Sequence, residues 1–304
     1  MKTYLQSYSL LHHYAHAPGY DVFAFLERAA AAGYAGVSIN VNGPGYRQLS
    51  GTSAGHLARV RDALDRLGLA CDLETSGTAP AHLDELTALC ERLGAPRLRT
   101  YLRHEGTVEE QIARTTADLR AAAPACAARG VTVLLENHED LTGAELARIV
   151  TGVGHDAVGA LYDYGNSMMV GEDPAVALDA VLPHVRSAHL KDHVCVAGPG
   201  GAPWVLGVPI GTGVLPIAEL TGALAAARCE VVIVSNVFAY RAPVRSWRGG
   251  SDAGEGVFRV EQPPFDPLRR PWDPQPSELR VQLEADSLAL GERWLRAAGL
   301  VDLR

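Results

Sequence analysis

Carboxylate and imidazole side chains follow three short apolar stretches in the middle of this sequence. Glu136, Asp163 and His189 each lie where such a stretch gives way to polar, turn-forming residues. Two carboxylates and one imidazole form an open ligand set for Mn, Fe, Co or Zn, with positions left for substrate oxygens. A divalent cation stabilises the enediolate formed when a proton is taken from the carbon beside a carbonyl group. A single Asp or Glu after a strand is usually a helix N-cap or a solvated loop charge, so the three residues must be shown to converge.

Convergence requires elements that bring the three residues to one place. Apolar runs alternate with helix-like runs about every 30 residues, which is the size of one βαβ unit. Several of the apolar runs are almost continuous Val, Leu and Ile, as in parallel strands covered by helices. No Gly-x-Gly-x-x-Gly follows an early strand. We therefore predict an α/β fold, a (β/α)8 TIM barrel formed by residues 1–304 as a single domain. The strands are expected to begin near Tyr4, Gly36, Leu69, Arg97, Val131, Val158, Val185 and Glu230.

Neighbouring strands of such a barrel lie about 4.8 Å apart, so side chains at consecutive strand ends can share one cation. Two irregular stretches, 198–213 and Arg241–Pro276, are expected as extended loops after strands seven and eight. Both should lie at the carboxyl end of the barrel, where active sites are built. The first is rich in Gly and could hold a phosphate through backbone N–H groups, although it lacks Gly-Lys-Ser/Thr. A final amphipathic helix is expected over Ser277–Ala298.

Composition and charge exclude several classes of protein. The 304 residues include 27 basic and 35 acidic side chains, for a formal net charge of -8, which argues against a general binder of nucleic acid. No run of 18 apolar residues is present, so we predict no membrane association. The five cysteines are widely spaced and form no Cys-x-x-Cys. Reduced, buried thiols and a cytoplasmic location are expected.

The motifs around the candidate ligands resemble those of the xylose isomerase-like barrels, a group of sugar phosphate isomerases and epimerases. The resemblance spans nearly the whole chain and is carried by Leu135-Glu136-Asn137-His138, Asp163-Tyr164-Gly165-Asn166-Ser167, Gly171-Glu172-Asp173-Pro174, His189-Leu190-Lys191-Asp192, Ser7-Tyr8-Ser9 and Gly254-Glu255-Gly256-Val257-Phe258.

The resemblance implies a role for each matching position. Glu136, Asp163 and His189 would hold a divalent metal, with Mn, Co, Mg and Zn all compatible. Glu136 or His138 would move the proton, and Lys191 would contact substrate. Related barrels form dimers or tetramers, so a homo-oligomer is expected. The remaining candidate contacts to substrate are His13, Arg103, Asn166, Asn236 and Arg241.

One position departs from the family pattern. Members usually carry a second Glu at the end of strand eight, as the fourth ligand and the other proton-transfer group; here Ser235 and Asn236 stand there. Three explanations are open. Water or the Asn236 amide completes the metal shell, another carboxylate such as Glu74 substitutes, or metal binding has been lost.

The expected function is that of a metal-dependent isomerase or epimerase. Its substrate would be a sugar or a related polyhydroxy carbonyl compound, processed through an enediolate. One alternative is a lyase, which dehydrates or β-eliminates a keto sugar or cyclic polyol. Another is a metal-free, non-catalytic binding barrel or partner subunit. The expected partner is a small molecule rather than a nucleic acid; a DNA-repair endonuclease of the same superfamily is disfavoured by the acidic charge.

Overall fold

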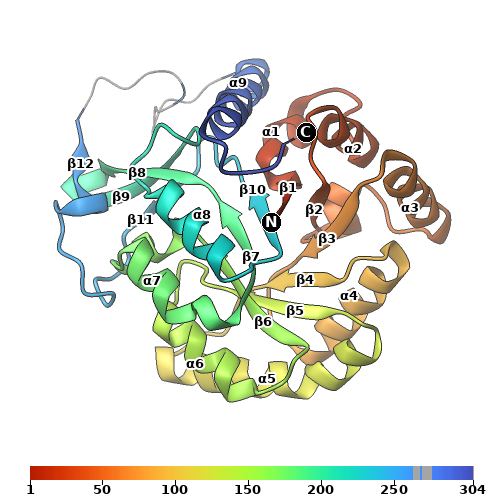
Figure 1. The fold of residues 1–304 in the computed structure, drawn as a ribbon, viewed down its shortest axis with the longest axis horizontal. Helices are drawn as coiled ribbons and strands as arrows, with labels where there is room; N and C mark the ends of the chain where they lie inside the picture. Colours follow the sequence, from red (N-terminus) through yellow and green to blue (C-terminus); the bar gives the residue numbers. More distant parts are fainter. Residues whose placement is uncertain (263–267, 269–275, 304) are drawn as a thin grey trace.

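Eight parallel strands close into a barrel ringed by helices in the computed structural model, which describes residues 1–262, 268 and 276–303 (Figure 1). The strand order around the barrel is β1-β10-β7-β6-β5-β4-β3-β2. The predicted (β/α)8 barrel is therefore confirmed. Its strands are β1 (Lys2–Gln6), β2 (Gly36–Asn40), β3 (Ala70–Glu74), β4 (Arg97–Thr100), β5 (Thr132–Glu136), β6 (Val158–Asp163), β7 (Val185–Leu190) and β10 (Val231–Val234).

The helices begin and end at residues with strong capping preferences. Thr107 and Thr142 each form a capping box with the Glu three residues later. Gly68, Gly94 and Gly154 end their helices in the left-handed conformation that glycine adopts most readily. The helices are α1 (Leu11–His16), α2 (Val22–Ala31), α3 (Ala54–Leu67), α4 (Pro80–Leu93), α5 (Val108–Ala128), α6 (Gly143–Val153), α7 (Pro174–Val181), α8 (Ile217–Ala226) and α9 (Ser277–Ala298). No helix in the described ranges is both long and apolar enough to cross a membrane.

A second, four-stranded sheet lies beside the barrel, where loops were expected. Its order is β11-β9-β8-β12, formed by β8 (Asp192–Ala197), β9 (Pro203–Val208), β11 (Arg241–Pro243) and β12 (Val260–Glu261). The prediction of irregular structure was thus wrong for much of 198–213. Val194 and Val196 pack with Leu206 and Val208, and the Gly-rich turn at 198–201 joins β8 to β9 as a hairpin. Part of the segment Arg241–Pro276 lies outside the described residues.

The amino end of the barrel is closed by a buried ion pair. Arg97 Nε lies 2.8 Å from Asp72 Oδ2, and Arg97 Nη1 lies 2.9 Å from Glu230 Oε2. The Tyr4 hydroxyl accepts a further hydrogen bond from Arg97 at 3.3 Å.

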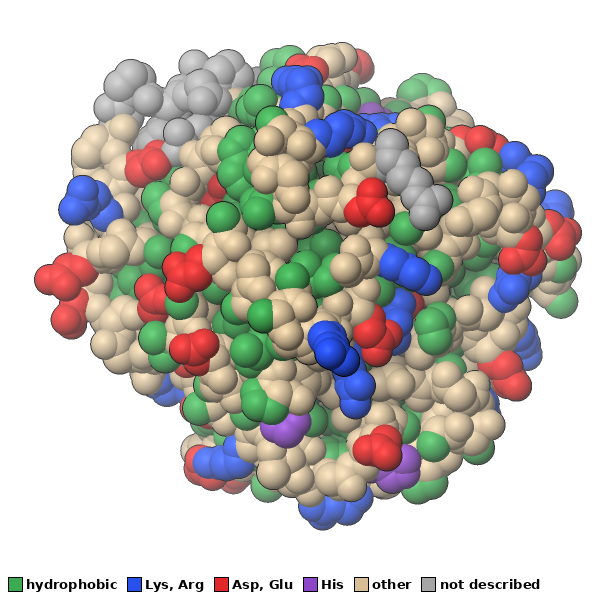
Figure 2. Space-filling model, viewed as in Figure 1, with side chains coloured by type: hydrophobic (Ala, Val, Ile, Leu, Met, Phe, Trp, Pro, Cys, Tyr) green, Lys and Arg blue, Asp and Glu red, His purple; other side chains and the backbone are tan. Residues whose placement is uncertain are grey.

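On the face that Figure 2 shows, acidic and basic side chains are interspersed, and neither sign gathers into a broad patch.

The middle of the barrel is filled by an apolar layer. Tyr4, Leu134, Leu161, Val231 and Ile233 form one buried cluster. Above this layer the inward-facing residues become polar. The polar groups at the carboxyl ends of the strands therefore lie next to a closely packed apolar layer.

Candidate active site

The three predicted ligands converge at the carboxyl end of the barrel. Glu136 ends β5, Asp163 ends β6, and His189 in β7 pairs in register with Asp163. One ligand atom from each residue lies within 4.8 Å of the others, and all three side chains are buried. Register between adjacent parallel strands thus produces the cluster that the sequence predicted.

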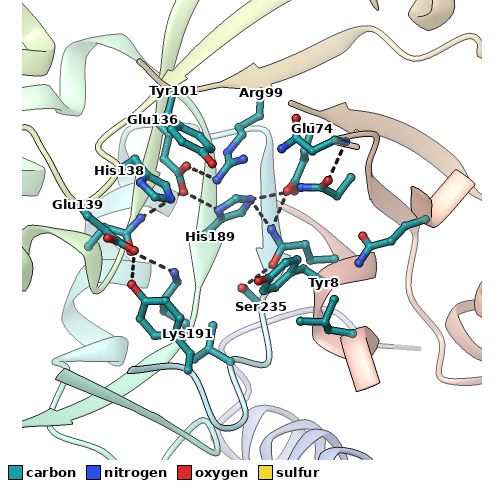
Figure 3. Close-up of a pocket in the computed structure, with 18 of the residues that line it drawn as sticks. Tyr8, Glu74, Arg99, Tyr101, Glu136, His138, Glu139, His189, Lys191 and Ser235 are labelled. Atoms are coloured by element: carbon teal, nitrogen blue, oxygen red, sulfur yellow. Dashed lines mark hydrogen bonds and ion pairs between the residues drawn. The ribbon is translucent and has the colours of Figure 1, made fainter. Parts of the chain in front are cut away.

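His189 lies at the centre of this cluster, between carboxylates on both sides of its ring (Figure 3). Its Nδ1 is 2.9 Å from Glu136 Oε1 and 3.5 Å from Asp163 Oδ2, whereas its Nε2 is 3.0 Å from Glu74 Oε1. Burial alone would lower the pKa of the imidazole. The surrounding carboxylates, Glu74 first among them, outweigh burial and raise the pKa of His189 to about 10.

Two cationic side chains also face the predicted ligands. Arg99 of β4 forms an ion pair with Glu136 Oε2, and Lys191 Nζ lies 2.7 Å from Asp163 Oδ2. Burial would raise the pKa of both carboxyl groups, but Arg99 and Lys191, together with His189, hold each pKa below its ordinary range. Both carboxylates are consequently ionised at neutral pH, as metal ligands must be.

Ser235, directly after β10, contributes a hydroxyl group where the resemblance predicts a carboxylate. Ser235 Oγ donates to Gln6 Oε1 at 2.5 Å, and Gln6 Nε2 donates to Glu74 Oε2 at 2.7 Å. Ser38 Oγ donates to the other oxygen of Glu74 at 2.6 Å. Glu74 faces His189 Nε2, whereas Glu136 and Asp163 face Nδ1, and the two ring nitrogens point in different directions. Glu74 is therefore poorly placed to replace the missing ligand on a cation held at Nδ1.

The donor set fits a divalent cation. Glu136 Oε2 and Asp163 Oδ2 are buried, and neither accepts a hydrogen bond from the part of the chain that the structure describes. Each faces a cationic side chain instead. A cation bound by these oxygens and by His189 Nδ1 would replace the ring proton and compete with Arg99 and Lys191 for the carboxylates. Two carboxylates and one imidazole suit several divalent ions.

A cavity of about 420 Å³ opens above the cluster. His138 and Tyr101 form part of its wall, with ring centroids 3.8 Å apart and planes at 9°. Burial is the main cause of a lowered pKa at His138, so this imidazole is neutral at pH 7. Its Nδ1 has no hydrogen-bond partner among the described residues. A neutral imidazole on the cavity wall, two residues beyond Glu136, is suited to proton transfer.

The other predicted site residues divide into two groups. Lys191, Arg103 and Asn166 line the cavity, and Lys191 Nζ donates to Asn166 Oδ1 at 3.2 Å. His13, Asn236 and Arg241 are not among the lining residues. The substrate contacts predicted for these three remain predictions, but their positions do not support them.

Helix α9 explains two of these positions. His13 Nδ1 lies 2.6 Å from Glu284 Oε2. The Asn236 amide donates to the backbone oxygens of Ser9 and Glu284 at 3.3 Å and accepts from Ser287 Oγ. Both side chains thus anchor α9 against the barrel. Arg241 begins β11 and pairs with Leu206 of β9 in the second sheet.

Sequence reasoning missed several residues that shape the site. Arg99 is one; the alternation of Arg97, Arg99 and Tyr101 along one strand was the signal that they share a face. The contacts that join Glu139 to Tyr240 and Arg245 were missed as well: the tyrosine hydroxyl and the guanidinium both contact the Glu139 carboxylate. These contacts tie the segment after β10 to the loop after β5. They join residues that are far apart in sequence and carried no local signal.

The Gly-rich loop after β9 does not offer a free phosphate cradle. The Asp192 carboxylate accepts hydrogen bonds from the backbone N–H groups of Gly211 at 2.9 Å, Gly213 at 2.8 Å and Leu215 at 3.3 Å. A Cβ at position 213 would lie 2.2 Å from Asp192 Oδ1, so glycine is required there. The anion-binding N–H groups of this loop are therefore already occupied by the chain's own carboxylate.

Two known proteins are similar to this chain in sequence. The uncharacterised protein YihM of Escherichia coli K12 is 30% identical over 206 residues, which span 65% of this chain and 63% of YihM. The match to YihM thus covers less than two thirds of that protein. The 3-oxo-isoapionate decarboxylase of Pectobacterium atrosepticum is 27% identical over 199 residues, spanning 63% of this chain and 68% of the decarboxylase.

Solved structures share the fold at low sequence identity. D-psicose 3-epimerase with D-tagatose, from Clostridium cellulolyticum H10, superposes with a TM-score of 0.64 at 15% identity, covering 96% of this chain and 99% of that one. The IOLI protein with a bound zinc atom gives a TM-score of 0.62 at 13% identity, covering 97% and 99%. The profile of the xylose isomerase-like TIM barrels matches residues 26–254. The chain therefore belongs to the xylose isomerase-like TIM barrel family.

Proposed function

We propose that this protein is a divalent-metal-dependent isomerase that moves a proton on the carbon beside the carbonyl group of a polyhydroxy compound. The observation that carries the proposal is the convergence of Glu136, Asp163 and His189 beneath a cavity of about 420 Å³. The zinc of the IOLI protein and the sugar in the D-psicose 3-epimerase structure support it by analogy of fold. Bound to these residues, a divalent cation would stabilise negative charge on the substrate oxygens.

The side chains around the cavity supply the remaining functions. Glu136 or His138 takes the proton from carbon, since both belong to the same strand end and the neutral His138 lines the cavity. Lys191 and Asn166, which also line the cavity, hold a substrate oxygen. The stacked Tyr101 keeps His138 in one orientation. The substrate proton and its base are thus positioned before the reaction begins.

The serine that replaces the second Glu after β10 favours chemistry with one base. Epimerisation at one carbon normally needs acid/base groups on both faces of that carbon. Ser235 stands where the second Glu of the family lies, and its hydroxyl is already bonded to Gln6. A 1,2-isomerisation returns the proton on the same face and needs no second acid. We therefore favour isomerisation over epimerisation.

A lyase is the second candidate. The relative from Pectobacterium atrosepticum is a 3-oxo-isoapionate decarboxylase. Loss of CO2 from a 3-oxo acid leaves an enolate that the same cation can stabilise, and this step requires no base. The absence of a Glu directly after β10 is compatible with this reaction too.

Solvent exchange distinguishes these reactions. The protein, loaded with Mn²⁺, is incubated in D₂O with ketopentoses, ketohexoses and their 3-oxo acids, and the products are followed by NMR and mass spectrometry. Deuterium at the carbon beside the carbonyl, with a new aldose or ketose, is the expected result. Loss of CO2 or water identifies the lyase instead.

Two variants assign the activity to the site. Glu136→Gln should abolish exchange, whereas Glu91→Gln, an exposed position on α4, should leave it unchanged. The proposal is overturned if no substrate shows exchange or product, or if Glu136→Gln is as active as the wild type.

A further inference from the structure

We propose that the substrate carries a carboxylate group and that Arg47 and Arg103 bind it at the mouth of the cavity. This inference rests on the proposed function, because it takes the cavity above Glu136, Asp163 and His189 as the substrate site. It narrows the substrate from polyhydroxy carbonyl compounds in general to sugar acids.

The charges lining the cavity carry the argument. Arg99, Lys191 and Arg245 line it, and each is paired with a carboxylate of the protein. Arg47 and Arg103 line it as well, but neither guanidinium has a carboxylate within ion-pair distance in residues 1–262, 268 and 276–303. The wall therefore presents two uncompensated positive charges to the cavity.

Arg103 is held in place without being neutralised. Its Nη2 donates to the Tyr101 hydroxyl at 2.6 Å, and its guanidinium carbon lies 4.7 Å from the centre of the Tyr101 ring. Tyr101 is itself fixed by stacking on His138. These contacts orient the guanidinium and keep its charge, which lowers the entropic cost of binding an anion.

Arg47 approaches the cavity from the neighbouring loops. It belongs to the turn Pro44–Leu49 after β2, whereas Arg103 follows β4. Asn42 connects this side of the mouth to the β3 loop, because its Oδ1 accepts hydrogen bonds from Thr75 and Ser76. Planar guanidinium groups bind carboxylates through paired N–H donors. Arg47 and Arg103 come from the loops on either side of the β3 loop and line the same cavity, so one carboxylate bound there can meet both.

A phosphate is the less favoured anion. Gly211, Gly213 and Leu215 do not line this cavity, and their backbone N–H groups are satisfied by Asp192, so the Gly-rich loop offers a phosphate no cradle here. The cavity volume of about 420 Å³ suits a small sugar acid, and the amides of Asn40 and Gln48 on its wall are suited to hydroxyl groups. Charge, donors and size thus agree on a carboxylated, polyhydroxylated ligand.

Equilibrium binding tests the proposal without any turnover. Isothermal titration of the Mn²⁺-loaded protein is carried out with threonate, ribonate and gluconate, and with the matching neutral alditols threitol, ribitol and glucitol. Glucitol 6-phosphate serves as the phosphate probe. The acids should bind at least about tenfold more tightly than their alditols, which corresponds to about 1.4 kcal/mol. Failure of every acid to bind, equal binding of acids and alditols, or tightest binding of the phosphate overturns the proposal.

Variants assign the effect to the two arginines. Arg47→Gln and Arg103→Gln should each weaken binding of the acids about tenfold and leave alditol binding unchanged, because one guanidinium contact is lost. Arg92→Gln, on the exposed side of α4, should change neither. Acid binding that survives in the double variant overturns the inference. Arginine-dependent binding without solvent exchange would refute the proposed function alone.

Discussion

Lys191 competes with a metal ion for Asp163, and its removal should tighten metal binding. Lys191 Nζ lies 2.7 Å from Asp163 Oδ2, and both side chains are buried. A divalent cation bound to this oxygen must displace the ammonium group or tolerate its repulsion. Replacing Lys191 with Met keeps a side chain of similar length and removes the competing charge.

The expected magnitude follows from this contact. At 2.7 Å and an effective dielectric constant of about 20, the attraction between the two charges is about 6 kcal/mol. Desolvation offsets most of it, and a close contact of this kind between charged groups contributes about 1.5–3 kcal/mol net. Lys191→Met should therefore bind Mn²⁺ about thirtyfold more tightly, which corresponds to about 2 kcal/mol. The metal-free variant should be less stable by about 3–5 kcal/mol, because Asp163 loses its partner.

Two measurements check this prediction. Calorimetric titration with Mn²⁺ gives the dissociation constant, and urea unfolding with and without Mn²⁺ gives the stability. The control variant, Lys191→Arg, retains the charge and should bind Mn²⁺ within about threefold of the wild type. If Lys191→Met binds Mn²⁺ no more tightly than the wild type, the competition inferred from this geometry does not exist.

Three further predictions concern stability and proton transfer. Burial raises the pKa of Glu172 from 4.5 to about 7, despite the hydrogen bond that its carboxylate accepts from Gly143 N. The stability that this carboxyl group contributes is therefore complete below pH 4.5 and is lost as the pH rises through 7. The free energy of unfolding of Glu172→Gln in urea should therefore match that of the wild type at pH 4.5 and exceed it by up to about 3 kcal/mol at pH 8. Identical pH profiles of this free energy would contradict the prediction. Arg97→Met should cost about 3–5 kcal/mol in urea unfolding by leaving Asp72 buried without its partner, and adding Asp72→Leu should recover most of the loss. His138→Gln should slow turnover about 100- to 10,000-fold with an unchanged circular dichroism spectrum, and full activity would remove His138 from proton transfer.

The barrel and the cluster of candidate metal ligands could be predicted because their signals are local. Each strand is a short apolar run, and the polar residue that ends it is the residue presented to the site. Glu136, Asp163 and His189 were found in this way, because parallel register places consecutive strand ends side by side. The hairpin of β8 and β9 also had a local signal, in Val-rich runs flanking a Gly-Pro-Gly-Gly turn, but its turn-rich composition was taken for a loop.

The contacts between distant segments could not be predicted. His13 and Asn236 follow β1 and β10, yet they bind α9, which packs over them. Nothing in their own neighbourhood indicates that a helix some 50 residues or more away will occupy that position. Arg245 likewise reaches Glu139 only because a long segment folds back over the cavity. Side-chain roles that depend on such docking become visible only in three dimensions.

Metal content tests the central claim of this account most directly. The protein is incubated with Mn²⁺, dialysed and measured by elemental mass spectrometry, alongside a Glu136→Gln/His189→Gln double variant. Glu74→Gln serves as the control, since Glu74 faces the opposite nitrogen of His189. We expect a nearly stoichiometric metal ion in the wild type and in Glu74→Gln, and none in the double variant. No metal in the wild type, even with Co²⁺ or Zn²⁺, or equal metal in the double variant, would contradict a metal site at the ends of β5, β6 and β7.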